Sequence, residues 1–205
     1  MNLQHIRSRR FPVFIALTAL TTLCFTPCAI GEPSGSELPE EKQTSLGLYL
    51  TAGEAYDRWQ AAPGNVTVLD VRTTEEYIYI GHAPMAWNVP LASQTYEWDA
   101  DKQEFLLQPN RAFISQVKEF AQPSDTILVM CRSGGRSALA VNNLAEAGFT
   151  DVYQITDGFE GDPVKDPESV FLGQRLRNGW KNSGLPWGYQ PNPERMRFAN
   201  KETKE

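Results

Sequence analysis

The chain has 205 residues, 41% of them apolar, which suffices for one ordinary domain with a buried core but not for two large domains. Its formal net charge is −6, so the protein as a whole is acidic. After the N-terminal segment, the chain has no stretch rich in Lys and Arg that could neutralise successive phosphates. We therefore expect no nucleic-acid partner.

The N-terminal segment has the pattern of an export signal. Three arginines and no acid precede or flank the apolar run 11–30, and small residues stand at Ala29 and Gly31. These features predict a signal peptide over 1–31 and an exported, periplasmic or otherwise extracytoplasmic protein. If the signal stays uncleaved, the same run is just long enough to anchor the chain, and only then do we expect a membrane partner.

Cleavage changes the chemistry that remains available. The net charge falls from −6 to −9 because three positive charges leave and no negative ones do. Cys131 becomes the single cysteine and His82 the single histidine, so an internal disulfide is impossible and we expect no metal site. A lone cysteine in an oxidising compartment is either buried and inert or kept for its reactivity.

The mature chain predicts alternating helices and strands between a flexible leader and a disordered tail. The leader, 32–45, is rich in Glu, Pro, Ser and Gly, and the tail, 191–205, is charged. In chain order we expect a helix over 52–61, a strand over 65–71, a helix from 73 to 81, a strand over 87–91, a loop over 92–110, a helix over 110–121, a strand over 126–130, a helix over 136–146 and a strand over 151–155. This order favours one α/β domain, 46–190, with a parallel sheet covered on both faces.

The candidate site is the segment that joins the strand over 126–130 to the next helix. It reads Cys131, Arg132, Ser133, Gly134, Gly135, Arg136 and Ser137. Paired glycines let several backbone N–H groups point at one spot, and the helix adds the positive end of its dipole. A thiol in that field ionises more easily, and the thiolate is the nucleophile. Cys131 is therefore predicted to be an activated nucleophile, against the alternative of a buried apolar side chain.

Two other polar residues suggest roles in catalysis, but each has a simpler interpretation. His82 would be the base of a Cys–His pair, although we favour a hydrogen-bonded structural histidine. Asp70 at a strand end would be an acid or base, although an Asp-x-Arg pair with Arg72 is more often a fixed ion pair.

Four motifs in order resemble the rhodanese-like family. The loop from Cys131 is similar to the family's CRSGxRS. The segments 69–77, 81–90 and 179–187 resemble its LDVR…EE(Y/F), GHIPGAxNIP and closing GGWxxxGLP motifs. The resemblance implies a five-stranded parallel sheet with helices on both faces, and an enzyme that moves sulfane sulfur as a persulfide on Cys131. It implies a small sulfur donor such as thiosulfate, a thiol or cyanide acceptor, no cofactor, and Asp70 and Arg72 as supports of the loop.

Alternatives stay open at this point. A Cys-dependent phosphatase or arsenate reductase shares this fold, but its loop has five residues between Cys and Arg, whereas four separate Cys131 from Arg136. A non-catalytic binding or redox-sensing module is the other alternative. The segment 159–178 is an insert relative to the family pattern, and we expect it to border the active-site face. Ser133 stands where two-domain thiosulfate enzymes often have Lys, so the physiological donor is open.

Overall fold

A computed structural model describes residues 38–198 of the chain, and the predicted signal peptide lies outside these residues. The helices are α1 (Ala52–Ala61), α2 (Thr74–Tyr79), α3 (Phe113–Val117) and α4 (Gly135–Glu146), with short 3-10 turns η2 (Glu40–Lys42) and η3 (Pro193–Arg195). The strands are β1 (Tyr49–Leu50), β2 (Val66–Asp70), β3 (Trp87–Asn88), β4 (Ala92–Asp99), β5 (Glu104–Pro109), β6 (Thr126–Met130) and β7 (Val152–Ile155).

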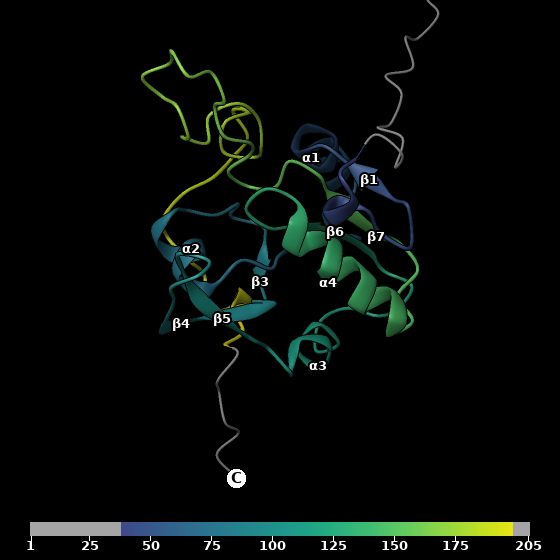
Figure 1. Cartoon of the computed structure of the whole chain (residues 1–205). Helices are drawn as coiled ribbons and strands as arrows, with labels where there is room; N and C mark the ends of the chain where they lie inside the picture. The colour runs from purple at the N-terminus through teal and green to yellow at the C-terminus, as the bar shows by residue number, and fades with distance from the viewer. Residues whose placement is uncertain (1–37, 199–205) are drawn as a thin grey trace, which may run out of the picture. The chain divides into compact units, whose positions relative to one another are not determined.

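Five strands form one parallel sheet in the order β1-β7-β6-β2-β3 (Figure 1). Side chains alternate along β6, so that Ile127 and Val129 join the core beneath α3 and α4, while Leu128 and Met130 join the core beneath α1 and α2. Burial on both faces explains the nearly continuous apolar sequence of the central strands. The predicted five-stranded parallel sheet with helices on both faces is confirmed.

Both predicted capping boxes form. The Thr51 and Glu54 pair begins α1, and the Thr73 and Glu76 pair begins α2, each with reciprocal side chain to backbone hydrogen bonds. These caps place the N-termini of both helices at the carboxyl edge of the sheet, where the strand–loop–helix segment with Cys131 also lies.

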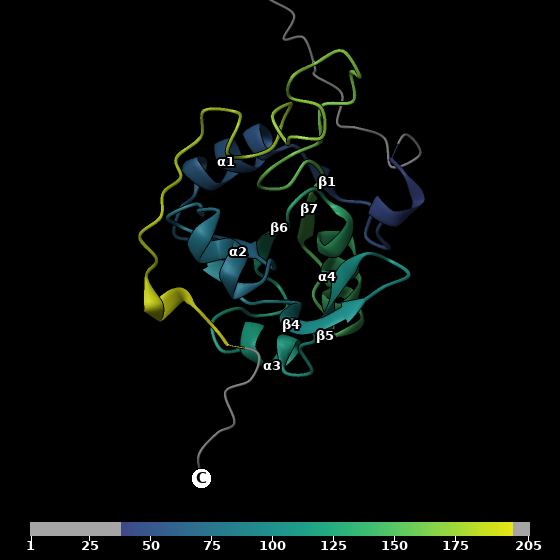
Figure 2. The same ribbon diagram turned by 60° about the vertical axis from the view of Figure 1, so that its left-hand side comes forward.

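The segment predicted as a loop over 92–110 is instead a β-hairpin of β4 and β5 (Figure 2). Trp98 pairs with Phe105 across the hairpin, with ring centroids 5.2 Å apart, and the Thr95 hydroxyl donates to Leu106 O. The prediction was wrong because the apolar residues of this segment do not face the core, so they give no core-directed alternation.

Four shorter predictions also need correction. The strand over 87–91 ends at Asn88, although Val89 N and Leu91 N still donate to Asp70 O and Val71 O of the neighbouring chain segment. The helix over 110–121 shortens to α3: it begins later because the Asn110 side chain accepts from Ala112 N in a turn, and residues 118–120 form a turn after it. Leader and tail are ordered where the structure describes them: Lys42 Nζ donates to Thr156 O, and Arg197 N donates to Asn88 O.

Candidate active site

The thiol of Cys131 lies where β6 passes into α4. Its residue is only 2% exposed, and Gly134 N–H donates to Sγ over 3.2 Å. Gly134 has φ +111°, and a Cβ at this position would lie 2.4 Å from Thr156 O, so only glycine fits. The Gly134 carbonyl accepts from the Ser137 hydroxyl (2.8 Å) and from Gln154 Nε2 (2.9 Å). These contacts fix the Gly134–Gly135 peptide, which is adjacent to the Ser133–Gly134 peptide whose N–H faces the sulfur.

The loop residues that the sequence singled out fall into three groups. Cys131, Gly134 and Ser137 are buried, Ser133, Gly135 and Arg136 are partly buried, and Arg132 is exposed. The twelve-residue helix α4 begins at Gly135, so its positive end points toward the loop. The exposed Arg132 adds positive charge at the surface beside the thiol.

A second backbone segment, 158–161, packs against the loop and donates hydrogen bonds to its first two carbonyl groups. Phe159 N–H donates to Cys131 O (2.8 Å), and Glu160 and Gly161 N–H groups both donate to Arg132 O. A Cβ at Gly158, where φ is +63°, would lie 2.6 Å from Cys131 O. Sequence reasoning did not assign this segment to the site; its signal was the pair of glycines at the start of the insert.

Asp70 and Arg72 form a wholly buried ion pair beside that segment. Arg72 donates to both carboxylate oxygens of Asp70, the shorter contact being 2.6 Å, and also to Gly81 O at 2.8 Å. The guanidinium carbon of Arg72 lies 4.0 Å from the centre of the Phe159 ring. The backbone N–H of Phe159 donates to Cys131 O, so Phe159 contacts both the ion pair and the loop.

A second ion pair joins the N-termini of α2 and α4. Arg136 donates through both terminal nitrogens to the two Glu76 oxygens, at 2.7 Å each. Burial raises the pKa of Glu76, but the hydrogen bonds and charge of Arg136 outweigh it and hold that pKa below its usual value. Burial lowers the pKa of Arg136, yet Glu76 and, to a smaller extent, Cys131 raise it overall.

Glu76 is therefore part of the site, although it was not among the predicted site residues. In the sequence, Glu76 was explained by its capping interaction with Thr73, so it gave no separate sign of a role in the site. The partner, Arg136, lies 60 positions away, and only the fold brings the two together.

His82 does not contact the thiol through its ring nitrogens. Nδ1 lies 3.0 Å from Tyr77 O, Nε2 lies 3.2 Å from Gln190 O, and the ring stacks on Tyr77 with centroids 4.0 Å apart. The ring is buried and tied to two carbonyl groups, so it holds the turn after α2 against the chain before the tail.

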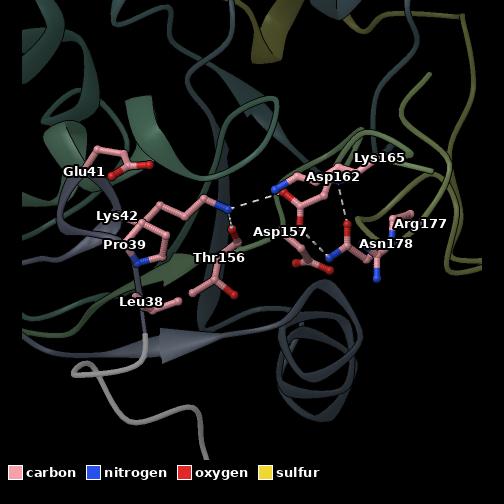
Figure 3. A pocket seen from close by; sticks show the side chains of 10 residues that line it. All are labelled: Leu38, Pro39, Glu41, Lys42, Thr156, Asp157, Asp162, Lys165, Arg177 and Asn178. Carbon is pink, nitrogen blue, oxygen red and sulfur yellow. Dashed lines mark hydrogen bonds and ion pairs between the residues drawn. The ribbon is translucent and has the colours of Figure 1, made fainter. Parts of the chain in front are cut away.

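A cleft of about 430 Å³ lies beside the loop on the β7 side. Its lining residues are Leu38, Pro39, Glu41, Lys42, Thr156, Asp157, Asp162, Lys165, Arg177 and Asn178. Figure 3 shows the Lys42 side chain directed at Asp162, and their charged atoms are 3.6 Å apart. Cys131 is not part of this lining, so the cleft is separate from the thiol. Lys42 packs against Gly134, which places the cleft directly behind the loop.

Asp157 in this cleft ties three segments together. Its two carboxylate oxygens accept from Ala52 N (2.8 Å) and Gly179 N (2.9 Å). Burial raises the pKa of Asp157, more than these hydrogen bonds lower it. Within residues 38–198, no three His, Cys, Asp or Glu side chains are grouped to hold a metal ion, and no helix has the length and hydropathy to cross a bilayer.

Comparisons with known proteins agree with this geometry. The family model for the rhodanese-like domain matches residues 51–162. Thiosulfate sulfurtransferase 16, chloroplastic, of Arabidopsis thaliana is 41% identical over 118 residues, 58% of this chain and 76% of that protein. An uncharacterized protein of Rickettsia prowazekii, RP600, is 32% identical over 130 residues, 61% and 85% of the two chains. The crystal structure of Rv0390 from M. tuberculosis is similar with a TM-score of 0.54 and 27% identity, over 69% of this chain and 97% of that one. With a cysteine loop on the carboxyl edge of this sheet and a family match over more than half of its length, the chain belongs to the rhodanese-like domain family.

Proposed function

We propose that the protein is a sulfurtransferase that carries sulfane sulfur as a persulfide on Cys131. The observation that supports this most directly is the Gly134 N–H at 3.2 Å from Sγ, at the start of α4. Backbone N–H groups and a helix N-terminus stabilise negative charge on sulfur without a general base. The same groups then stabilise the persulfide anion, as an oxyanion hole stabilises oxygen.

Two nucleophilic displacements make up the reaction. The Cys131 thiolate attacks the outer sulfur of thiosulfate, a new S–S bond forms, and the S–S bond of thiosulfate breaks. Sulfite leaves with the bonding electron pair. Cyanide or a thiolate then attacks the terminal sulfur, takes it as thiocyanate or a new persulfide, and releases the Cys131 thiolate. No external oxidant, metal or organic cofactor enters either step.

The surrounding charges fit small anionic donors. Arg136 is a fixed positive charge close to Cys131, and Arg132 supplies a second at the surface. Both lower the cost of bringing a dianion to an anionic nucleophile. Because Cys131 is almost completely buried, a donor that presents one sulfur atom end-on fits better than a bulky one.

The phosphatase alternative finds less support in the same geometry. Both terminal nitrogens of Arg136 are bonded to Glu76, so its guanidinium fork is already occupied. A phosphate-binding arginine would need that fork for phosphate oxygens.

Intact-mass measurement tests the proposal. Incubation of the full chain with thiosulfate should add the mass of one sulfur atom, and cyanide should remove it. Cys131→Ser should abolish both the gain and thiocyanate production. This variant keeps Cys24 and Cys28 in the precursor, so it also controls for sulfur taken up by other cysteines. A serine variant that still produces thiocyanate would refute the proposal.

We also propose that the protein acts outside the cytoplasm. The support is the arginine-led apolar run 11–30 and the small residues that precede Glu32. Expression in a Gram-negative host should yield a periplasmic protein whose first residue is Glu32. N-terminal sequencing of a cytoplasmic product that keeps Met1 would contradict it.

A further inference from the structure

The β4–β5 hairpin presents its apolar side chains to solvent. Tyr96 is 95% exposed, Trp98 55%, Phe105 49% and Leu107 41%. Trp98 lies opposite Phe105 and Leu107 opposite Gln94, so the cross-strand pairs put Trp98, Phe105 and Leu107 on one face. Antiparallel hairpins normally turn the apolar face to the core and the polar face to water. Here the arrangement is reversed.

The other face of the hairpin is the more buried one. Thr95, Asp99 and Leu106 are partly buried, although two of them are polar. Figure 2 shows the hairpin in front of α4, standing out from the sheet. Among residues 38–198, the apolar face is therefore left exposed, and an exposed aromatic patch of this kind marks an interaction surface.

The charged residues of the same hairpin are mostly acidic. The segment 92–109 carries Glu97, Asp99, Asp101 and Glu104 against the single cation Lys102. The excess of three negative charges favours a partner with Lys or Arg around its contact surface. It disfavours an anionic bilayer surface, which attracts basic segments and repels acidic ones.

The exposed area of the patch is too small for a stable dimer and suits a transient partner. From the exposed fractions of the four side chains, the area available is on the order of 500 Å² per copy. Two copies face to face would bury about 1,000 Å² in all, below the roughly 1,200–2,000 Å² of stable specific interfaces. The acidic residues of the two copies would also repel each other, so a second copy is the less favourable occupant.

We propose that the outer face of the β4–β5 hairpin, made by Tyr96, Trp98, Phe105 and Leu107, is the docking surface for another protein. This partner offers an apolar depression edged by Lys and Arg and binds transiently. The hairpin's aromatic side chains fill the depression, and its acidic residues pair with the basic edge. The surface is distinct from the Cys131 loop, and the proposal does not depend on sulfur transfer.

Site-specific photo-crosslinking in the source cell gives the first part of the test. Benzoylphenylalanine replaces Tyr96, and the matched control replaces Tyr79, an aromatic of α2 that is 75% exposed. The crosslinked protein is identified by mass spectrometry, expressed and purified. Its binding to the full chain is then measured by titration at low and high salt. We expect a protein crosslinked from position 96 and not from position 79, with affinity that falls as salt rises.

Variants of the hairpin complete the test. Leu107→Ser and the double change Glu97→Lys with Glu104→Lys should each raise Kd about tenfold or more, while Tyr79→Ser leaves it unchanged. Thiocyanate production from thiosulfate should be the same in all of these variants, which separates this surface from the catalytic loop and shows that the domain is folded. Four results would overturn the proposal: the same proteins crosslinked from both positions, crosslinks only to a second copy, variants that bind as the wild type does, or binding to vesicles of equal parts phosphatidylcholine and phosphatidylglycerol.

Discussion

Replacing Glu76 with Gln isolates the ion pair that joins α2 to α4. The amide keeps the size of the side chain and one acceptor for the cap at Thr73 N, but it removes the charge that faces Arg136. The two side chains of the pair are 20% and 24% exposed, so the remaining Arg136 charge is partly screened by water. Hydrogen bonds to charged groups contribute about 1.5–3 kcal/mol each, and breaking a fully buried pair costs roughly 3–5 kcal/mol. For this partly exposed pair we expect a loss of about 2 kcal/mol in the free energy of unfolding.

The pH dependence of that loss follows from the direction of the pKa shift. The folded-state pKa of Glu76 lies below its ordinary value, so its contribution is fully present above the unfolded pKa. It is lost as pH falls through the folded pKa. The stability gap between wild type and Glu76→Gln should therefore be constant near pH 7 and should close below about pH 4.

Urea unfolding at a series of pH values measures this gap, with Glu75→Gln as the matched control. Glu75 is the exposed neighbour on α2 and should change the midpoint little. Thiocyanate production should also fall about tenfold in Glu76→Gln, because Arg136 is no longer held beside Cys131. If Glu76→Gln unfolds like the wild type, or if Glu75→Gln loses as much stability, the pair does not brace the loop.

Four other expectations follow from the site. Arg136→Ala should lower sulfur transfer more than His82→Ala does in steady-state assays, since Arg136, unlike His82, interacts with Cys131 through its charge; a folded but inactive His82→Ala would instead indicate base catalysis. Gly134→Ala should cost about 2 kcal/mol or more in thermal unfolding and abolish transfer, because of its φ and the contact with Thr156 O; a fully active variant would contradict the proposed role of the Gly134 N–H in stabilising the sulfur anion. Asp157→Asn should destabilise by roughly 1–2 kcal/mol in urea, since one of two backbone N–H groups loses its acceptor; an unchanged midpoint would show that water replaces it. A short Gly-Ser link in place of 164–176 should leave the melting temperature nearly unchanged and alter the preference between small and bulky donors; equal rates for every donor would rule out a role in access.

The sequence predicted best those elements whose stabilising contacts are local or whose burial is complete. The helix Ala52–Ala61 has the predicted bounds because its capping box and its ending turn are written in adjacent residues. The strand Thr126–Met130 has the predicted bounds because a central parallel strand is apolar on both faces. The position of the cysteine loop could be predicted for the same reasons, since the loop lies between a central apolar strand and a helix.

What sequence reasoning missed depends on contacts between distant positions. The η2 turn is held by Lys42, whose ammonium bonds to a carbonyl 114 positions away, and leader composition alone gives no sign of it. Met196 is buried beside β3 although the surrounding tail is charged. A segment with few apolar residues can still be ordered when one or two of its side chains find a partner on the domain.

The insert 159–178 has two parts: its first residues contact the loop that begins at Cys131, and its outer residues do not. Composition favoured treating the whole of 159–178 as surface, but its first residues pack against the loop that begins at Cys131. Phe159 is fully buried and bonds to Cys131 O, and Glu160 and Gly161 bond to Arg132 O. Phe171 and Leu172, the main apolar pair of the insert, are by contrast about half exposed and belong to neither core cluster. Any change of donor preference must therefore come from the outer part, whereas changes at the inner end act directly on the loop that holds the thiol.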